Sequence, residues 1–167
     1  MTSFAPAITV RTARTTDLPA LLDLKRAAAT RAYSPFATPE ALDSWLAARA
    51  TPEKLTELFE TPDSSFLLAE AGGELVGMAY LAFIDADSAY FGDLYCATDG
   101  RGVGSALLDA CLRRARLAGV SRMSCHCFEL NARAQDFLAK KGFEVVDVTP
   151  AKDDLGAGQL LELERDL

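Results

Sequence analysis

Three glycines at alternate positions form the segment of this chain best suited to binding an anion. Residues 99–104 read Asp-Gly-Arg-Gly-Val-Gly, and Ser105 follows them. Glycine adopts backbone conformations that other residues disfavour and lets a ligand approach the main chain closely. Where such a turn opens a helix, its unpaired N–H groups and the helix dipole attract a phosphate, while Arg101 adds a charge and Ser105 a hydroxyl. A diphosphate suits this chemistry, although a plain tight turn between a strand and a helix has the same sequence.

The glycine segment differs from two common nucleotide-binding motifs. A P-loop ends in Gly-Lys-Ser or Gly-Lys-Thr, which this segment lacks. A Rossmann fingerprint follows the first strand of a βαβ unit, whereas these glycines follow the third of three consecutive expected strands. The context therefore favours neither motif, and a mononucleotide-binding fold is the remoter alternative.

Two titratable side chains beyond the glycine segment could take part in proton transfer. His126, the only histidine, lies within an expected strand, and imidazole accepts protons near neutral pH, although a histidine with interior partners is the commoner structural explanation. Glu129 follows the same strand and could hold a water molecule, or could simply be solvated. The cysteines form neither a C-x-x-C pair nor a zinc-ligand spacing, so we expect reduced core thiols and no metal site. These cysteines are Cys96, Cys111, Cys125 and Cys127.

Turn and capping residues predict the elements that position these side chains. Asp17, Thr38 and Thr51 can each cap a helix, because a proline follows one or two residues later. Gly72-Gly73 joins two apolar strand patterns as a hairpin. Strands are expected at 8–13, 66–70, 75–83, 89–96, 120–128, 144–148 and 158–163, and further helices at 102–118 and from Asn131 to Gly142.

This order predicts an α/β fold with a mixed sheet in one domain over residues 1–167, with residues 1–7 flexible. Short connections make strands 66–70, 75–83 and 89–96 an antiparallel meander. The helix between strands 89–96 and 120–128 makes those two strands a parallel pair.

Several stretches of the chain resemble the GNAT superfamily of N-acetyltransferases, and the resemblance spans almost the whole chain. They are Leu94-Tyr95-Cys96 with the glycine segment, Ser105-Ala106-Leu107-Leu108, and Asn131-Ala132-Arg133-Ala134 through Lys141-Gly142-Phe143. Ile8-Thr9-Val10-Arg11 with Asp17, and Leu75-Val76-Gly77, are also similar to the opening of that family.

The resemblance implies a sheet of about seven strands, mostly antiparallel, in which strands 89–96 and 120–128 splay apart between four to five flanking helices. Acetyl-CoA is then the co-substrate, with its pantetheine arm along Leu94 to Cys96 and its diphosphate on the glycine segment. Asn131 would contact the cofactor arm, besides its structural role as a helix cap. The cofactor-binding residues implied are Leu94, Tyr95, Cys96, Arg101, Gly102, Val103, Gly104, Ser105 and Asn131.

Two departures from the family pattern affect the site. Asp99 stands where the family has Gln or Arg, and the segment before the loop is about two residues short. An aspartate near a diphosphate is unfavourable, so we expect it to turn outward or to cap the turn, with cofactor affinity in question. Leu138 stands where the family commonly has a tyrosine that protonates the departing thiolate, so water or another hydroxyl would have to supply that proton.

The reaction that the resemblance implies is direct attack of an amine on the thioester, with the backbone N–H of Leu94 at the developing oxyanion. Asp93 matches a family position close to the acceptor and joins Glu129 and His126 as a base candidate, with a solvated strand-end carboxylate as its alternative. Tyr33 and Tyr90 are expected to contact the acceptor, although ordinary core packing would explain them equally well.

The acidic composition narrows the partners. A net charge of −7 and a pI near 4.7 argue against a nucleic-acid partner and favour a cationic acceptor. Residues 100–122 oppose this trend with five arginines and one acid, which suits a phosphate-bearing ligand or a solvated helix face. No apolar stretch is long enough to span a membrane, and no signal peptide is visible, so we expect a cytoplasmic location.

The expected function is transfer of an acetyl group to a primary amine of a small molecule, in a chain that could form a homodimer. One alternative is acetylation of protein lysines or N-termini. Another is a non-catalytic acyl-CoA-binding regulatory module, which Asp99 and Leu138 favour.

Overall fold

A seven-stranded mixed sheet forms the centre of the molecule, in a computed structural model that describes residues 5–152 and 155–167. Most of the segment expected to be flexible, residues 1–4, lies outside the described residues. The strand order is β1-β2-β3-β4-β5-β7-β6, and every neighbouring pair is antiparallel except the parallel pair β4 and β5. The strands are β1 (Ile8–Thr12), β2 (Ser64–Ala71), β3 (Glu74–Phe83), β4 (Ser88–Cys96), β5 (Arg122–Phe128), β6 (Glu144–Pro150) and β7 (Gln159–Asp166). The mixed sheet predicted from the sequence is confirmed.

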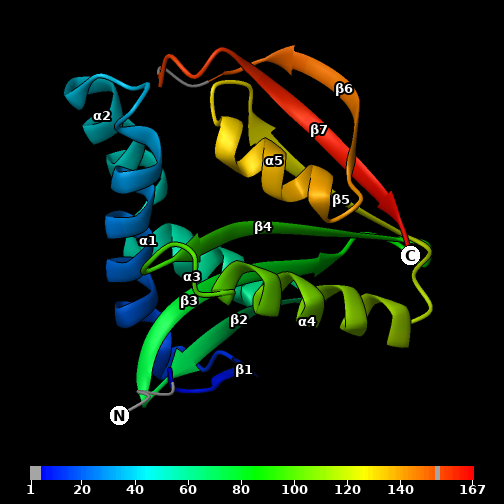
Figure 1. Ribbon diagram of the computed structural model, residues 1–167. Helices are drawn as coiled ribbons and strands as arrows, with labels where there is room; N and C mark the ends of the chain where they lie inside the picture. Colours follow the sequence, from blue (N-terminus) through cyan, green and yellow to red (C-terminus); the bar gives the residue numbers. More distant parts are fainter. Residues whose placement is uncertain (1–4, 153–154) are drawn as a thin grey trace.

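In the described part of the chain, five α-helices cover the two faces of this sheet (Figure 1). One buried cluster joins the sheet to α4 and α5, and a second joins it to α1, α2 and α3. The helices are α1 (Leu18–Tyr33), α2 (Pro39–Arg49), α3 (Pro52–Glu60), α4 (Val103–Leu117) and α5 (Ala132–Lys140), with a short 3-10 turn, η1 (Thr15–Asp17), before α1. The two cores therefore fix α1 and α4 on opposite faces of β3 and β4.

The predicted helix starts are confirmed, with one difference in how they are capped. Thr38 and Thr51 accept hydrogen bonds from Ala41 N and Lys54 N, each at 3.2 Å, as capping threonines should. Asp17 stands at the N-cap of α1, but its carboxylate accepts bonds from the side chain of Arg11 instead. Asp17 therefore ties the start of α1 to β1.

β4 and β5 diverge after a short parallel pairing. Their register covers only three residue pairs, the last of which is Tyr90 with Ser124. On its other side, β4 carries a bulge against β3, and Asp93 in this bulge has a φ of 47°. Because bulges bend and twist a strand, β4 leaves β5 at this point. The gap opens where the sequence resemblance implied a splay.

The faces of β5 follow strict alternation. Met123, Cys125 and Cys127 are buried against α4 and α5, whereas His126 is exposed on the opposite face. All four cysteines are free, and Cys96 is the one that is only half-buried. The side chain of His126 therefore faces the region where β4 has departed.

Candidate functional site

The glycine segment turns the chain from the end of β4 into α4. Gly100 and Gly102 both have a φ of 74°, and a Cβ atom on either would meet no atom within 4 Å. Backbone conformation, rather than crowding, therefore requires glycine at these two positions. Gly102 is the N-cap of α4, so the open space beside it faces the positive end of the helix.

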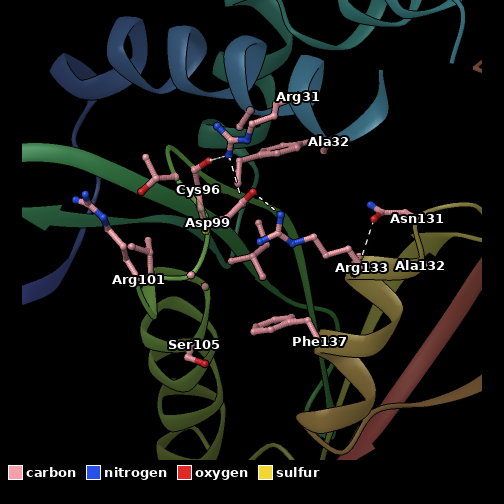
Figure 2. A pocket seen from close by; sticks show the side chains of 18 of the residues that line it. Arg31, Ala32, Cys96, Asp99, Arg101, Ser105, Asn131, Ala132, Arg133 and Phe137 are labelled. Atoms are coloured by element: carbon pink, nitrogen blue, oxygen red, sulfur yellow. Dashed lines mark hydrogen bonds and ion pairs between the residues drawn. The ribbon is translucent and has the colours of Figure 1, made fainter. Parts of the chain in front are cut away.

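A cavity of about 600 Å³ lies beside this loop, between α1, the end of β4, α4 and the start of α5. All nine residues that the sequence analysis assigned to the cofactor line this cavity. Figure 2 shows Ser105 and Arg101 on one side of it and Asn131 and Phe137 on the other. Asn131 Oδ1 accepts a hydrogen bond from Ala134 N at 3.2 Å, so this asparagine does cap α5. A cradle of this size, with helix N–H groups and arginines at one end, fits the diphosphate end of acetyl-CoA.

Asp99 was expected to turn outward or to cap the turn. In the structure, two arginines bind its carboxylate (Figure 2). Arg133, from the first turn of α5, forms an ion pair with Asp99 Oδ2. Arg31, from α1, lies 3.7 Å from Asp99 Oδ1 and also donates to the carbonyl oxygens of Cys96 and Ala97 at 2.5 and 2.6 Å. Sequence reasoning missed both arginines, although Arg133 lies within the Asn-Ala-Arg-Ala stretch that carried the resemblance.

A second cavity of about 340 Å³ lies on the other side of the end of β4. Its walls include Tyr33 and Tyr90, the two residues expected to contact the acceptor, together with Trp45 and Phe128. Both cavities share Leu94, Tyr95, Asn131, Ala134 and Phe137 as lining residues. The backbone of Leu94 and Tyr95 therefore lies where the two spaces meet.

Three tyrosines line the second cavity beside this meeting point: Tyr33 and Tyr95, which are buried, and Tyr90, which is partly buried. The hydroxyls of Tyr33 and Tyr95 lie 3.2 Å apart. Burial raises the pKa of Tyr95 and of Tyr90 well above the ordinary value, and the negative charge of Asp93 raises it further. Both phenols stay protonated at neutral pH and are available as hydrogen-bond donors. This supply of hydroxyls matters because Leu138, buried in the wall of the second cavity, offers none.

The structure separates the three base candidates. Asp93 lines the second cavity, but Lys25 Nζ binds its carboxylate at 2.8 Å, so the solvated strand-end alternative is wrong. His126 lines the same cavity and is exposed, which contradicts the interior alternative, and its ring centroid lies 5.5 Å from that of Tyr90. Glu129 is outside the lining of both cavities, and its Oε2 accepts from Gln159 N at 3.0 Å. Of the three candidates, only His126 combines access to the second cavity with a side chain outside an ion pair in the described contacts.

The cysteine thiols are held in their neutral form. Cys96 lines the first cavity, and burial, together with the charge of Asp99, raises the pKa of its thiol. Burial raises the pKa of Cys127 to about 11 and that of Cys111 to about 12. Since the thiolate is the nucleophilic form of cysteine, these thiols are poor candidates for a covalent step.

Within residues 5–152 and 155–167, no group of three or more His, Cys, Asp or Glu side chains is placed to hold a metal ion. In the same described part of the chain, no helix is both long enough and apolar enough to cross a membrane.

Comparison with solved structures shows the same fold in several acetyltransferases. The PaiA N-acetyltransferase of Thermoplasma acidophilum, solved in complex with coenzyme A, superposes with a TM-score of 0.83 at 23% identity, covering 96% of this chain and 99% of that one. Ard1 of Thermoplasma volcanium gives 0.77 at 20% identity, with 96% and 98% covered. An aminoglycoside 6'-acetyltransferase of type Ii gives 0.70 at 14% identity, with 95% and 96% covered. At these identities the likeness establishes the fold.

A search of curated protein sequences finds no match to this chain. The model of the acetyltransferase (GNAT) family does match this chain, over residues 26–143. These residues include the glycine segment, the splayed strands and most of the residues that line the two cavities. The chain therefore belongs to the GNAT family and is an acyltransferase.

Proposed function

We propose that this protein transfers the acetyl group of acetyl-CoA to a primary amine of a small molecule by direct attack. The observation that carries the proposal is the pair of cavities that meet at Leu94 and Tyr95. Acetyl transfer without a covalent enzyme intermediate requires two substrates aligned in one complex. Two spaces joined at one strand end provide that alignment.

The first cavity supplies the cofactor half of this complex. The loop N–H groups, Arg101 and the α4 dipole would hold the diphosphate of acetyl-CoA, which supplies the acetyl group as a thioester. Beyond Tyr90 the edge of β4 has no pairing with β5, so its backbone groups are available to a ligand. The N–H of Leu94 is our candidate for the oxyanion donor.

The second cavity supplies the acceptor half, and its size favours a small molecule. A volume of about 340 Å³ falls at the lower end of the range for small-ligand pockets, roughly 300–1,000 Å³. Its aromatic walls suit an apolar or cationic amine, because a cation is attracted to the face of an aromatic ring. The net charge of −7 also favours a cationic acceptor, because it attracts cations to the protein.

We assign the base to His126 rather than to Asp93 or Glu129. The imidazole lines the acceptor cavity, whereas Lys25 and Gln159 N hold the two carboxylates. Leu138 offers no acid, so water or a hydroxyl of Tyr33, Tyr90 or Tyr95 in the lining of the second cavity would have to supply the proton that the thiolate takes up.

The test of the transferase is release of free thiol from acetyl-CoA in the presence of a panel of amines, amino acids and lysine-containing or N-terminal peptides. Gly104→Trp would fill the first cavity, because a Cβ at Gly104 already lies 3.6 Å from the ring of Phe137. Ala118→Trp, exposed at the other end of α4, is the matched control. We expect small-amine-dependent thiol release in the wild type and in Ala118→Trp, and its loss in Gly104→Trp. Release with peptides alone would instead favour a protein acetyltransferase.

The base assignment needs its own variant. His126→Gln should lower kcat by roughly 10²-fold or more at neutral pH, with recovery at alkaline pH as the amine loses its proton to solvent. Glu129→Gln, outside both cavities, should leave kcat near that of the wild type. Equal losses in both variants would remove the base role from His126.

A non-catalytic acyl-CoA-binding module is the second candidate function. Leu138 removes the usual acid, and Lys25 neutralises Asp93. Acetyl-CoA binding without thiol release from any amine in the panel would favour this module over the transferase.

A further inference from the structure

Two arginines from separate elements converge on one carboxylate at the mouth of the first cavity (Figure 2). Arg31 belongs to α1 and Arg133 to α5, and Asp99 lies between them in the loop after β4. The three side chains together bridge the cavity from one wall to the other.

This bridge contributes little to the stability of the fold. The side chains of Arg31, Asp99 and Arg133 are 45%, 45% and 68% exposed. Ion pairs between exposed side chains contribute little net stability, because water and salt screen them. The position of the bridge over the cavity therefore needs another explanation.

Its charge sets Asp99 apart from the other residues that line the first cavity. The lining of the first cavity contains three arginines, Arg31, Arg101 and Arg133, and Asp99 is the only acid among its described lining residues. Guanidinium groups bind phosphate oxygens with the same forked geometry that they use for a carboxylate. Asp99 thus occupies, with its two oxygens, the place that a phosphate group would take between Arg31 and Arg133.

We propose that Arg31 and Arg133 form a phosphate-binding pair, and that Asp99 is an internal competitor that fills this pair until a phosphate group of the cofactor displaces it. The ligand is a phosphate of coenzyme A, either its monoester or its diphosphate, so the inference rests on the proposed function. Arg31 keeps its bonds to the carbonyls of Cys96 and Ala97, which hold its guanidinium in place during the exchange. Asp99 therefore weakens cofactor binding and makes it depend on the exchange of ion pairs.

The first test compares Asp99→Asn with Asp109→Asn by calorimetric titration of coenzyme A into the free protein. Both substitutions remove one negative charge, but Asp109 lies on α4, exposed and paired with Lys141 at 3.1 Å. Asp99→Asn should tighten coenzyme A binding about three- to tenfold, the range expected for breaking one or two exposed ion pairs. Asp109→Asn should change it less than twofold. Unchanged or weaker binding in Asp99→Asn would overturn the proposal.

A double-mutant cycle separates exchange of partners from plain repulsion. With Arg133→Gln as background, the gain from Asp99→Asn should shrink, because the arginine that the substitution releases is missing. An equal gain in coenzyme A affinity in both backgrounds would mean that Asp99 only repels the cofactor at a distance, and it would contradict the exchange of partners. Thermal unfolding of each variant checks that the fold is intact.

Dephospho-coenzyme A, which lacks the phosphomonoester, identifies the phosphate concerned. A gain with coenzyme A that disappears with the dephospho form assigns the arginine pair to the monoester, and a gain with both assigns it to the diphosphate. Failure of the wild type to bind coenzyme A at all would overturn the proposed function together with this inference. Binding by the wild type without the gain in Asp99→Asn would overturn the inference alone.

Discussion

Lys25 is the single charged residue among those described that the fold buries, at 4% exposure. Its Nζ binds Asp93 Oδ2 at 2.8 Å, and Asp93 lies in the bulge of β4 with a φ of 47°. A non-glycine residue rarely adopts this backbone region without support from its surroundings. Lys25 supplies that support from α1, and Asp93 lines the second cavity.

Replacing Lys25 should therefore destabilise the protein more than replacing both partners. Lys25→Met leaves the carboxylate of Asp93 without its cation and should lower the free energy of unfolding by about 3 kcal/mol. Lys25→Met combined with Asp93→Asn should recover much of that loss, because no unpaired charge is then buried. Urea unfolding of the two variants measures the difference, and equal losses would contradict a role for charge pairing.

At the scale of elements, Gly77 sets how closely α4 lies on β3. A Cβ atom at this position would lie 2.5 Å from Val103 Cγ1 and 2.8 Å from Leu107 Cδ1. Val103 is the first residue of α4 and lines the cofactor cavity. The contact with β3 thus positions the helix end that would face the diphosphate.

Gly77→Ala should displace the first turn of α4. We expect a loss of about 1–3 kcal/mol in the free energy of unfolding from overpacking, together with weaker coenzyme A binding. Val103→Ala should restore part of both losses in the double variant, because it removes the closer of the two methyl groups that the new Cβ meets, and the contact with Leu107 remains. Additive losses in chemical unfolding and calorimetry would argue against this contact as the cause.

Arg11 joins β1 to both β2 and the start of α1. Its guanidinium binds Asp17 at 2.9 Å and Glu70 at 2.8 Å. The hydrogen bonds from the Arg11 side chain, and next the backbone N–H of Arg14, lower the pKa of Asp17 from 3.8 to about 2. Because this carboxylate titrates at lower pH in the folded state than in the unfolded one, its contribution is present above the unfolded pKa and is lost as pH falls through the folded pKa.

Asp17→Asn should therefore destabilise the protein at neutral pH but not in strong acid. We expect a melting temperature about 2–4 °C below that of the wild type at pH 7, for a loss near 1 kcal/mol in a chain of this length. The difference should shrink as pH falls from about 4 to about 2, through the two pKa values of Asp17. Asp23→Asn, exposed on α1, is the control, and a pH-independent difference would contradict the linkage.

At the scale of the molecule, the cofactor cavity spans the two parts of the sheet that the splay separates. Leu94 to Cys96 line it from β4, and the α5 residues Arg133, Ala134 and Phe137 line it from the other wall. Coenzyme A at about 100 times its dissociation constant should stabilise the protein by roughly 2.7 kcal/mol, or about 5–10 °C. Hydrogen exchange should slow on both walls together, and protection confined to one wall would contradict a ligand that bridges them.

Local sequence signals predicted most of the fold, and they singled out the glycine segment that lines the first cavity. Thr38 and Thr51 cap the helices that they were expected to cap, Gly72-Gly73 makes the hairpin, and the glycine segment lines the cavity. The ion pair of Lys25 with Asp93 joins residues 68 positions apart, and no local pattern encodes such a distance. For His126, strand alternation predicts a side chain on the face opposite Cys125 and Cys127, but it does not predict that this side chain is exposed in the lining of the second cavity beside Tyr90.

The parallel pairing of β4 with β5, which we call the seam, is short, and its shortness has a kinetic consequence. The β3–β4 hairpin beside it closes over a short turn, whereas the seam must close across α4 before it gains only three residue pairs. Loop-closure entropy is spent before such non-local pairing stabilises the chain, so we expect the seam to form after the folding transition state. Substitutions at Ala89 or Met123 should then speed unfolding and leave the folding rate nearly unchanged, as stopped-flow chevrons would show. The strand junction beside which the two cavities lie would thus also govern how long the folded molecule persists.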